Sequence, residues 1–581
     1  MRDGLLDFVD TVRATQVYHR ESASISLETQ KAWRRAWVAL GVVIVLAFAC
    51  AGKADGPKSF VVAKDLIFRS LGAISCVAFA VALRQNEALL GREGLSPAWK
   101  VADVVAKRTS NFERYSILPT IAWRSFNGTR IDAVRFDGLM RSAAQLGFAS
   151  GLGLVVVGSS FFSGLLCFGI YVAQLSISSV GHPFYGYGWE SLLAELAFLC
   201  GLWSFELIPG VAAMRWLCFK IMFGAGLIKM RAARGRRDCW KDLTAMTLFF
   251  ETQPMPGPLS RRLHSLPRPL HLFATASNHV IELAAPLLLL IPFGTAAARA
   301  YGVVHLLFQV SLLFAGNLSF LNYLTMIPAI ACFDDKVFNL TPRPSRNFIQ
   351  LFGLLALAWL NLPVYQNLFA PSSTRLERPP RQAMNAAFDR ILNIGKTTIN
   401  LRHLRLANTY GAFGSVTNAR DELIISGSRG QPDNWDFREF EFHGPTCAQV
   451  APWHLRLDWQ KWIFSIPGRD PTMEPYFLAM LLKLIQQDPK ITRLLYKNPF
   501  TPENPPTHLR IQLFRYHFAP YEKKTVAARK KKDDETKEVP TPTVNDGIWQ
   551  RTLRTTVLRP IGQDDLQIAL LRLTKSPYFL S

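Results

Sequence analysis

The stretch that decides the fold begins with Phe219-Lys-Ile-Met-Phe-Gly-Ala-Gly-Leu-Ile-Lys229-Met and continues through Cys239-Trp-Lys-Asp-Leu-Thr and Phe249-Phe-Glu-Thr-Gln-Pro-Met-Pro-Gly-Pro-Leu-Ser260. It then passes Asn278-His-Val-Ile-Glu282-Leu-Ala-Ala-Pro and Gly316-Asn-Leu-Ser-Phe-Leu-Asn322-Tyr-Leu-Thr, and it ends with Cys332-Phe-Asp-Asp335. Acids, amides and a histidine stand here at the margins of apolar runs of lipid-spanning length. Burying such groups in a membrane costs free energy, so they are normally paired with another polar group or take part in the protein's function. The stretch therefore predicts a membrane domain whose polar groups have partners or a function.

The rest of the chain extends this membrane pattern. Of its 581 residues, 49% are hydrophobic, and residues 142–189, 300–333 and 347–374 carry no charged side chain when histidine is counted as neutral. Each run is long enough to cross a bilayer. A net charge of +23 fits nucleic acid or an anionic membrane surface. Because no recognition-helix or RNA-binding pattern accompanies it, we expect the lipid bilayer as a partner and no nucleic acid.

Composition divides the chain into three parts. Residues 1–35 are polar and precede an apolar run at 36–52, which favours a signal anchor behind a cytosolic N-terminal tail. Residues 36–371 are predicted to form a polytopic α-helical membrane bundle of about eight to ten helices, with polar loops at 84–141 and 229–278. Residues 372–581 are predicted to form a C-terminal β-rich (α+β) soluble domain.

Patterns inside the C-terminal part support this prediction. Strand-like alternation occurs at 397–406, 422–427, 435–442, 509–518 and 553–558. Apolar spacing predicts one helix over 476–485, and Asp488-Pro489 begins a second. The lysine and acid runs within residues 523–542 predict a disordered insertion.

Glu195 is the most unusual single residue, because it lies inside an apolar run. It would be protonated, paired with a buried base such as Lys220 or Lys229, or used as a proton relay. Lys229, Glu251, Asp334 and Asp335 could complete a polar pocket with it. The candidate functional residues of the membrane region are Trp189, Glu190, Glu195, Lys229, Glu251, His279, Glu282, Asn317, Asn322, Asp334 and Asp335.

His279 and Glu282 share one helical face, which suits metal or proton chemistry. A zinc site needs at least one more ligand, and neither His264 nor His271 has convincing spacing. We therefore expect a structural pair, with no metal and no other cofactor. The chain contains neither a Gly-x-Ser-x-Gly nor a Gly-x-x-x-x-Gly-Lys-Ser/Thr motif, so no residue is predicted to be catalytic.

In the C-terminal part, Gly411-Ala-Phe-Gly414 predicts a tight loop that carries the side chains of Asn408 and Tyr410 outward. Tryptophans of this part are expected mostly in its core. If some are exposed together, they would form an apolar platform for a partially folded client protein. The candidate client-contact residues are Asn408, Tyr410, Gly411, Asp458, Trp459 and Trp462.

Covalent modification is predicted at a few positions. Asn127-Gly-Thr129 and Asn339-Leu-Thr341 match the N-glycosylation pattern. Most of the eight cysteines lie in or beside apolar runs, as buried small hydrophobic residues do. A disulfide bond between Cys239 and Cys447 is left open.

Several long motifs occur in one order: GAGLIKM, CWKDLT, FFETQPMPGPLS, NHVIELAAP and AGNLSFLNYLT…CFDD. Gly186-Tyr-Gly-Trp-Glu190-Ser lies upstream of them, and Asn408-Thr-Tyr-Gly-Ala-Phe-Gly-Ser-Val-Thr, Leu457-Asp-Trp459-Gln-Lys-Trp462 and Asn498-Pro-Phe500 lie downstream. In these motifs the chain resembles the lipase maturation factor family over roughly residues 60–581.

The resemblance implies a multi-pass protein of the endoplasmic-reticulum membrane with a lumenal C-terminal domain. It also implies a chaperone, without enzymatic turnover, that assists the folding, assembly and export of secreted homodimeric lipases. Immature lipases would then be its client proteins. An integral membrane enzyme that uses buried carboxylates is the first alternative, and a transporter, which would show internal duplication of its spans, is the second.

Overall fold

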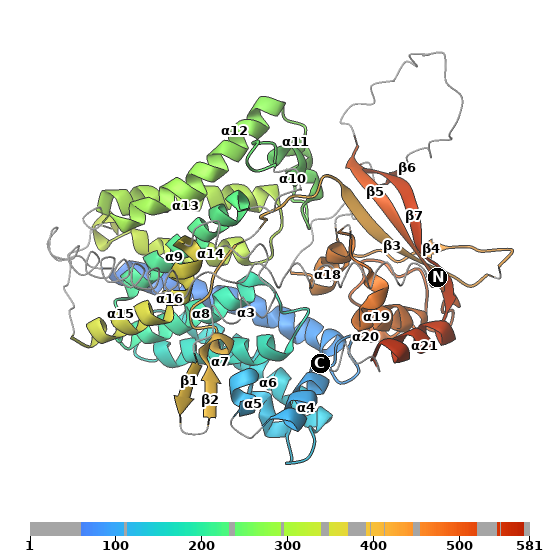
Figure 1. Ribbon diagram of the computed structural model, residues 1–581, viewed down its shortest axis with the longest axis horizontal. Helices are drawn as coiled ribbons and strands as arrows, with labels where there is room; N and C mark the ends of the chain where they lie inside the picture. The colour runs from blue at the N-terminus through green and yellow to red at the C-terminus, as the bar shows by residue number, and fades with distance from the viewer. Residues whose placement is uncertain are drawn as a thin grey trace, which may run out of the picture.

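Figure 1 shows the computed structural model. It describes residues 60–109, 113–231, 239–291, 295–338, 348–369, 391–394, 397–411, 413–430, 432–444, 454–466, 468–519, 543–545 and 548–574. The predicted cytosolic tail, the apolar run at 36–52 and the insertion predicted at 523–542 lie outside the described residues.

The first part of the described chain is a bundle of long apolar helices, drawn from blue to yellow in Figure 1. Six helical segments among the described residues are long and apolar enough to cross a membrane, and a seventh is added if a pair bent by 50° counts as one span. The six are α3 (Val61–Leu89), α6 (Ala133–Val157), α7 (Ser163–Val180), α9 (Gly210–Met230), the run from α12 (Arg268–His279) through η2 (Val280–Ala284) and η3 (Ala285–Leu290), and α13 (Thr295–Ala315). The bent pair is α15 (Phe348–Leu360) and α16 (Leu362–Phe369).

Two apolar segments form helices too short to meet the length expected of a span. The apolar run at 319–333 forms α14 (Leu321–Ala329) and the single turn η4 (Ile330–Cys332). The run that contains Glu195 forms α8 (Gly188–Ser204), which has 17 residues. Both lie largely inside the protein, and α8 buries both Glu190 and Glu195.

Close backbone contact holds the first helices of the bundle together. A Cβ atom added to Gly72 on α3 would lie 2.5 Å from the carbonyl oxygen of Gly151 on α6, and one added to Gly151 would lie 2.8 Å from that of Gly72. Small residues at such crossings let membrane helices pack closely. The uncharged run at 142–189 is divided near Gly158, because α6 ends at Val157 and α7 begins at Ser163.

Between these spans lie short helices at the polar segments. The segment after α3 forms α4 (Ala98–Arg108), α5 (Glu113–Ile117) and η1 (Ile121–Ser125). The segment after α9 forms α10 (Met246–Thr252) and α11 (Ser260–His264). Another short turn, η5 (Asp335–Phe338), follows α14 and η4.

The C-terminal region contains a five-stranded antiparallel sheet in the order β4-β3-β5-β7-β6. Its strands are β3 (Arg420–Ser428), β4 (Arg438–Glu439), β5 (His508–Phe518), β6 (Thr543–Asn545) and β7 (Trp549–Gly562). The helices are α18 (Arg456–Phe464), α19 (Pro475–Ile485), α20 (Pro489–Thr492) and α21 (Gln563–Thr574), with the turn η8 (Pro471–Met473). This arrangement confirms the predicted α+β class.

Some local predictions hold, and others are wrong. The helix predicted at 476–485 is α19, and Asp488 caps α20 by accepting a hydrogen bond from the Lys490 N–H. The strand predicted over 397–406 ends early, because β2 (Thr397–Asn400), which pairs with β1 (Ile391–Ile394), gives way to η7 (Leu401–Leu404). Helix α18 was not predicted, because its sequence is apolar on more than one face.

Figure 1 places α18 between the bundle and the sheet. The C-terminal end of α3 meets the same region, since the Gln85 side chain donates to the His454 carbonyl at 2.9 Å and Lys490 pairs with Glu87 at 3.3 Å. The short helices that follow α3 therefore lie at the end of the bundle that carries the C-terminal domain.

Candidate functional site

Most of the candidate acids meet basic or amide groups from distant parts of the chain. Three of them, Glu195, Glu190 and Glu251, form buried polar junctions between the membrane bundle and the segment after residue 400. We call these the Glu195, Glu190 and Glu251 junctions.

The Glu195 junction lies inside the bundle. Lys220 on α9 forms an ion pair with the Glu195 carboxylate, and both side chains are buried. The other carboxylate oxygen accepts hydrogen bonds from the Asn408 backbone N–H and side-chain amide, each at 3.0 Å, and from the Tyr410 hydroxyl at 2.7 Å. The predicted pairing with a buried base is thus confirmed for Lys220.

This geometry overturns the outward loop predicted at residues 408–414. Both Asn408 and Tyr410 point toward Glu195, because an uncompensated carboxylate in the bundle would be more costly than burying an amide and a phenol beside it. Gly224 makes room for them: a Cβ there would lie 2.3 Å from the Tyr410 carbonyl oxygen. Among the candidate client-contact residues in this loop, only Gly411 is exposed.

The Glu190 junction joins α8 to α18 of the C-terminal domain. The Arg456 guanidinium donates to Glu190 at 2.7 Å and to the Phe184 carbonyl at 2.7 Å. The amide of Gln174 and the indole N–H of Trp189 also donate to the Glu190 carboxylate, at 2.7 and 3.1 Å. Glu190 and Arg456 are both 0% exposed, so water does not compete for this ion pair.

Aromatic rings surround this junction. The ring of Trp189 stacks on Tyr187 at 4.5 Å and meets Trp459 edge-on at 5.1 Å. Trp459 is buried and Trp462 is half-buried. Trp459 therefore belongs to the packing between the domains, and Trp462 packs against it, with ring centroids 6.3 Å apart.

The Glu251 junction attaches β3 and β5 to the polar segment after α9. The Glu251 carboxylate accepts from the Phe518 backbone N–H at 2.8 Å and contacts His517 Nδ1 at 3.2 Å. Arg420 donates to the carbonyl groups of Glu251, Gln253 and Pro254 at 2.8, 2.5 and 3.1 Å. The sequence FFETQPMP thus supplies backbone acceptors for a buried arginine, whose charge is balanced by Glu422 at 2.7 Å.

Lys229 and Glu282 form a fourth buried ion pair, at 2.5 Å, with Asn278 beside it. His279 turns away from this pair and its Nε2 lies 2.8 Å from the Trp240 carbonyl oxygen. Among the described residues, no group of three or more His, Cys, Asp and Glu side chains could hold a metal ion.

The predicted common pocket of acids around Glu195 does not form. Asp334 pairs with Arg299 at 2.6 Å, and Asp335 accepts from the backbone N–H groups of Val61 and Val62 at 3.0 and 3.2 Å. Helical periodicity places a residue on a face, but it does not say which neighbouring helix that face meets. The acids are therefore distributed over separate contacts.

The amides of the AGNLSFLNYLT motif also have local roles. Asn317 accepts a hydrogen bond from the Ser319 N–H at 3.0 Å, which shapes the turn before α14. Asn322 is buried at 2% exposure. Cys239 is also buried, whereas Cys447 and the sequon residue Asn339 lie outside the described residues.

Sequence reasoning missed the arginines that complete the junctions. Arg456 and Arg420 lie in the soluble part, where arginines are common, and their positions gave no sign of full burial. The available signal was Glu190: a buried acid requires a base, and α7 and α8 contain no lysine or arginine.

Asp458 is the candidate with the clearest titration behaviour. Burial raises the pKa of Asp458 from its ordinary 3.8 to about 7, although Lys461 opposes the change. Between pH 3.8 and about 7, Asp458 holds a proton in the folded protein that it has lost in the unfolded chain. The free energy of unfolding therefore falls as pH rises through this range.

We expect Asp458→Asn to remove this pH dependence. The variant should lose less thermal stability than the parent between pH 4.5 and 7.5, by up to about 3 kcal/mol for a shift of this size. Melting of the purified full chain in detergent at both pH values measures the difference. Asp436→Asn, an exposed carboxylate in a surface ion pair, is the control, and parallel pH profiles for parent and Asp458→Asn would contradict the assignment.

The fold and these junctions define a class: a multi-pass membrane protein whose C-terminal α+β domain is joined to its helical bundle by buried polar contacts. The chain matches the family models of the lipase maturation factor transmembrane domain over residues 62–340 and of the lipase maturation factor C-terminal domain over residues 406–537. It belongs to the lipase maturation factor family.

Relatives from vertebrates agree with this placement. Lipase maturation factor 1 of Homo sapiens is 33% identical over 514 residues, covering 79% of this chain and 84% of the relative. The Bos taurus protein of the same name is 32% identical, with 79% and 85% covered. Lipase maturation factor 2 of Xenopus tropicalis is 25% identical, with 78% of each chain covered. No solved structure matches the chain.

Proposed function

We propose that this protein is a chaperone of the endoplasmic-reticulum membrane that assists the folding, assembly and export of secreted homodimeric lipases. Its family membership carries the proposal. The junctions support a scaffold rather than an enzyme, because Glu190, Glu195, Glu251 and Glu282 each have a cation or several hydrogen-bond donors as partners within the chain. Binding an unpaired lipase subunit would keep its dimer surface from aggregating.

The sheet of the C-terminal domain offers a place for such a client. Strand β6 pairs with β7 only at residues 549–551, so among the described residues the remainder of β7 has a strand partner on one side. Residues 553–556 of β7 are exposed. An open strand edge can add an extended segment of another chain through backbone hydrogen bonds. The client segment would lie along this edge, next to the exposed Arg554 and Arg559.

The test is a rescue assay in cells that lack their own lipase maturation factor. These cells would express this protein with a dimeric lipase, and the activity of secreted lipase per unit mass would be measured. The intact chain should restore this activity, whereas Arg554→Glu/Arg559→Glu should reduce it severalfold at equal expression. Arg438→Glu, on the other edge strand, is the matched control. Failure of a well-expressed intact chain to restore any activity would contradict the function, and full rescue by the double variant would remove the β7 edge as the client site.

A lumenal C-terminal domain makes a prediction for Asn127. This exposed side chain lies in the turn before α6, where its oxygen accepts from the Thr129 and Arg130 N–H groups at 3.1 and 3.0 Å. The turn is at the end of the bundle that carries the C-terminal domain, so both should face the lumen. We expect one N-glycan at Asn127, seen as a mass decrease on endoglycosidase treatment that Asn127→Gln and Thr129→Ala both abolish. An unmodified Asn127 in cells that glycosylate other secretory proteins would argue for the opposite orientation.

A further inference from the structure

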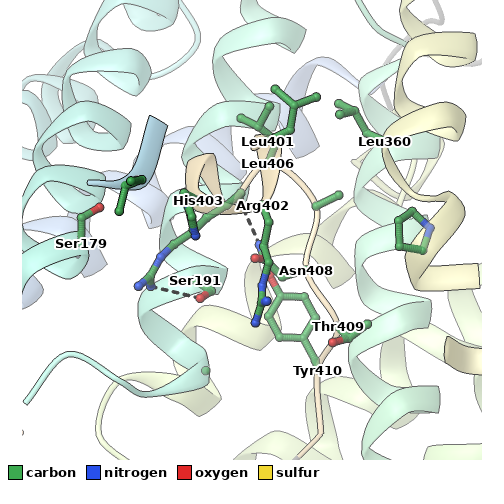
Figure 2. Close-up of a pocket in the computed structure, with 15 residues that line it drawn as sticks. Ser179, Ser191, Leu360, Leu401, Arg402, His403, Leu406, Asn408, Thr409 and Tyr410 are labelled. Carbon is green, nitrogen blue, oxygen red and sulfur yellow. Dashed lines mark hydrogen bonds between the residues drawn. The ribbon is translucent and has the colours of Figure 1, made fainter. Parts of the chain in front are cut away.

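A cavity of about 510 Å³ lies between the C-terminal end of α7, the N-terminal end of α8, the break between α15 and α16, and residues 401–410. Figure 2 shows the side chains that line it. Its size falls in the range of small-molecule sites, which is about 300–1,000 Å³. Asn408 and Tyr410 line the cavity and also donate hydrogen bonds to Glu195. The other residues of the three junctions do not line it.

One part of the cavity wall is basic. Arg402 and Arg405 both line it. The Arg405 guanidinium donates to the Ser191 hydroxyl at 3.1 Å and to the Ser178 carbonyl at 3.2 Å, both neutral acceptors. Arg405 forms no ion pair with any described residue. Glu190 acts on Arg405 electrostatically but is already paired with Arg456, so this partly buried cation lacks a carboxylate of its own among the described residues.

The surroundings of Arg405 favour an anion. Burial lowers the pKa of the Arg405 guanidinium, which shows that its charge is poorly solvated where it lies. A guanidinium presents several N–H groups in a plane and matches carboxylate and phosphate oxygens well. An anion in the cavity would supply the counter-charge that the described residues do not.

Another part of the wall is apolar and adjoins α15, a helix with exposed apolar side chains. Leu360, Leu401 and Leu406 gather in the upper part of Figure 2. Leu360 is the last residue of α15, and the preceding turns of this helix expose Phe352 and Leu355. Exposed apolar side chains on a membrane helix are suited to contact with acyl chains. The cavity therefore lies beside the exposed apolar face of α15.

We propose that this cavity binds a single-chain anionic amphiphile, with its carboxylate or phosphate head group on Arg405 and its acyl chain against Leu360 and Leu406. A free anion would satisfy Arg405 but would leave the leucines unused. A neutral lipid would use the leucines but would leave the guanidinium without a counter-charge. Only a ligand with both parts matches the whole cavity.

The test measures equilibrium binding to the full chain in nanodiscs of phosphatidylcholine. Radiolabelled oleate and radiolabelled lysophosphatidate are the two probes, and they distinguish carboxylate from phosphate. Acetate, inorganic phosphate and lysophosphatidylcholine are the competitors. At least one probe should bind saturably at one molecule per chain, and none of the three competitors should displace it at equal concentration.

Two variants locate the site. Arg405→Gln should weaken binding about tenfold, the loss expected for a hydrogen bond to a charged group. Leu360→Trp should fill the apolar part and abolish binding while leaving Arg405 and its hydrogen bonds in place. Leu355→Trp, on the exposed face of the same helix, is the matched control and should bind like the parent. Non-saturable uptake, unchanged binding by Leu360→Trp, or displacement by inorganic phosphate would each overturn the proposal.

Discussion

Replacing Arg456 by methionine is expected to lower the free energy of unfolding by about 3–5 kcal/mol, because Glu190 would keep its charge in a site without water. Glu190 is 0% exposed, and the remaining donors, Gln174 and Trp189, carry no charge. The C-terminal domain would lose its strongest contact with α8. Thermal melting of the purified full chain in detergent, followed by size-exclusion chromatography, measures the loss.

Two further variants separate the ion pair from general damage. The double variant Glu190→Gln/Arg456→Met should be more stable than Arg456→Met alone, because it removes both charges together. Arg438→Met breaks an exposed ion pair with Asp436 and should change stability by less than about 1 kcal/mol. If Arg456→Met melts at the same temperature as the Arg438→Met control, the Glu190 junction does not hold the domains together.

A second large effect is expected at the Glu195 junction. Glu195→Ala would leave the Lys220 ammonium buried without its counter-charge and would deprive Asn408 and Tyr410 of their acceptor. We expect a loss of about 3–5 kcal/mol, again measured by thermal melting. Tyr410→Phe removes a single hydrogen bond and should cost about 1 kcal/mol.

The same residue distinguishes a scaffold from an enzyme. Glu195→Gln keeps the shape of the side chain and an oxygen acceptor for Asn408 and Tyr410. If the bundle is a scaffold, the fraction of this variant that folds should restore lipase secretion as well as the parent does, per folded molecule. A folded, correctly located Glu195→Gln protein without any rescue would show that the carboxylate has a chemical role.

The sequence left Glu195 as protonated, paired with a buried base or used as a proton relay, and Lys220, its partner in the structure, was among the bases considered. It could not predict Asn408 and Tyr410 as further partners, because they lie 213 and 215 residues away and reach Glu195 from outside the bundle. Their motif looked like a surface loop because Gly411 and Gly414 suit a tight turn. The structure gives these glycines another role, since a Cβ added to Gly411 or Gly414 would lie 3.2 or 2.8 Å from the Ile228 side chain on α9.

The common pocket of acids shows the limit of reasoning from apolar runs. Such runs locate spans by length, and α6, α7 and α13 were found in this way. They do not give the rotation of each helix or the order of its neighbours. Asp334 and Glu251 therefore looked equivalent, yet one pairs with Arg299 inside the bundle and the other receives the Phe518 N–H of strand β5.

The separation along the chain between Glu190 and Arg456 is 266 residues, and it has a consequence for synthesis. At roughly 5–20 residues per second, a ribosome needs about 13–53 s to produce Arg456 after Glu190. During that interval the translocon must release α8 toward lipid with an acid whose base has not yet been made. Any protein that attends the nascent bundle would therefore be needed at α8 throughout this interval, and a chain truncated before residue 456 would keep this acid without its base permanently.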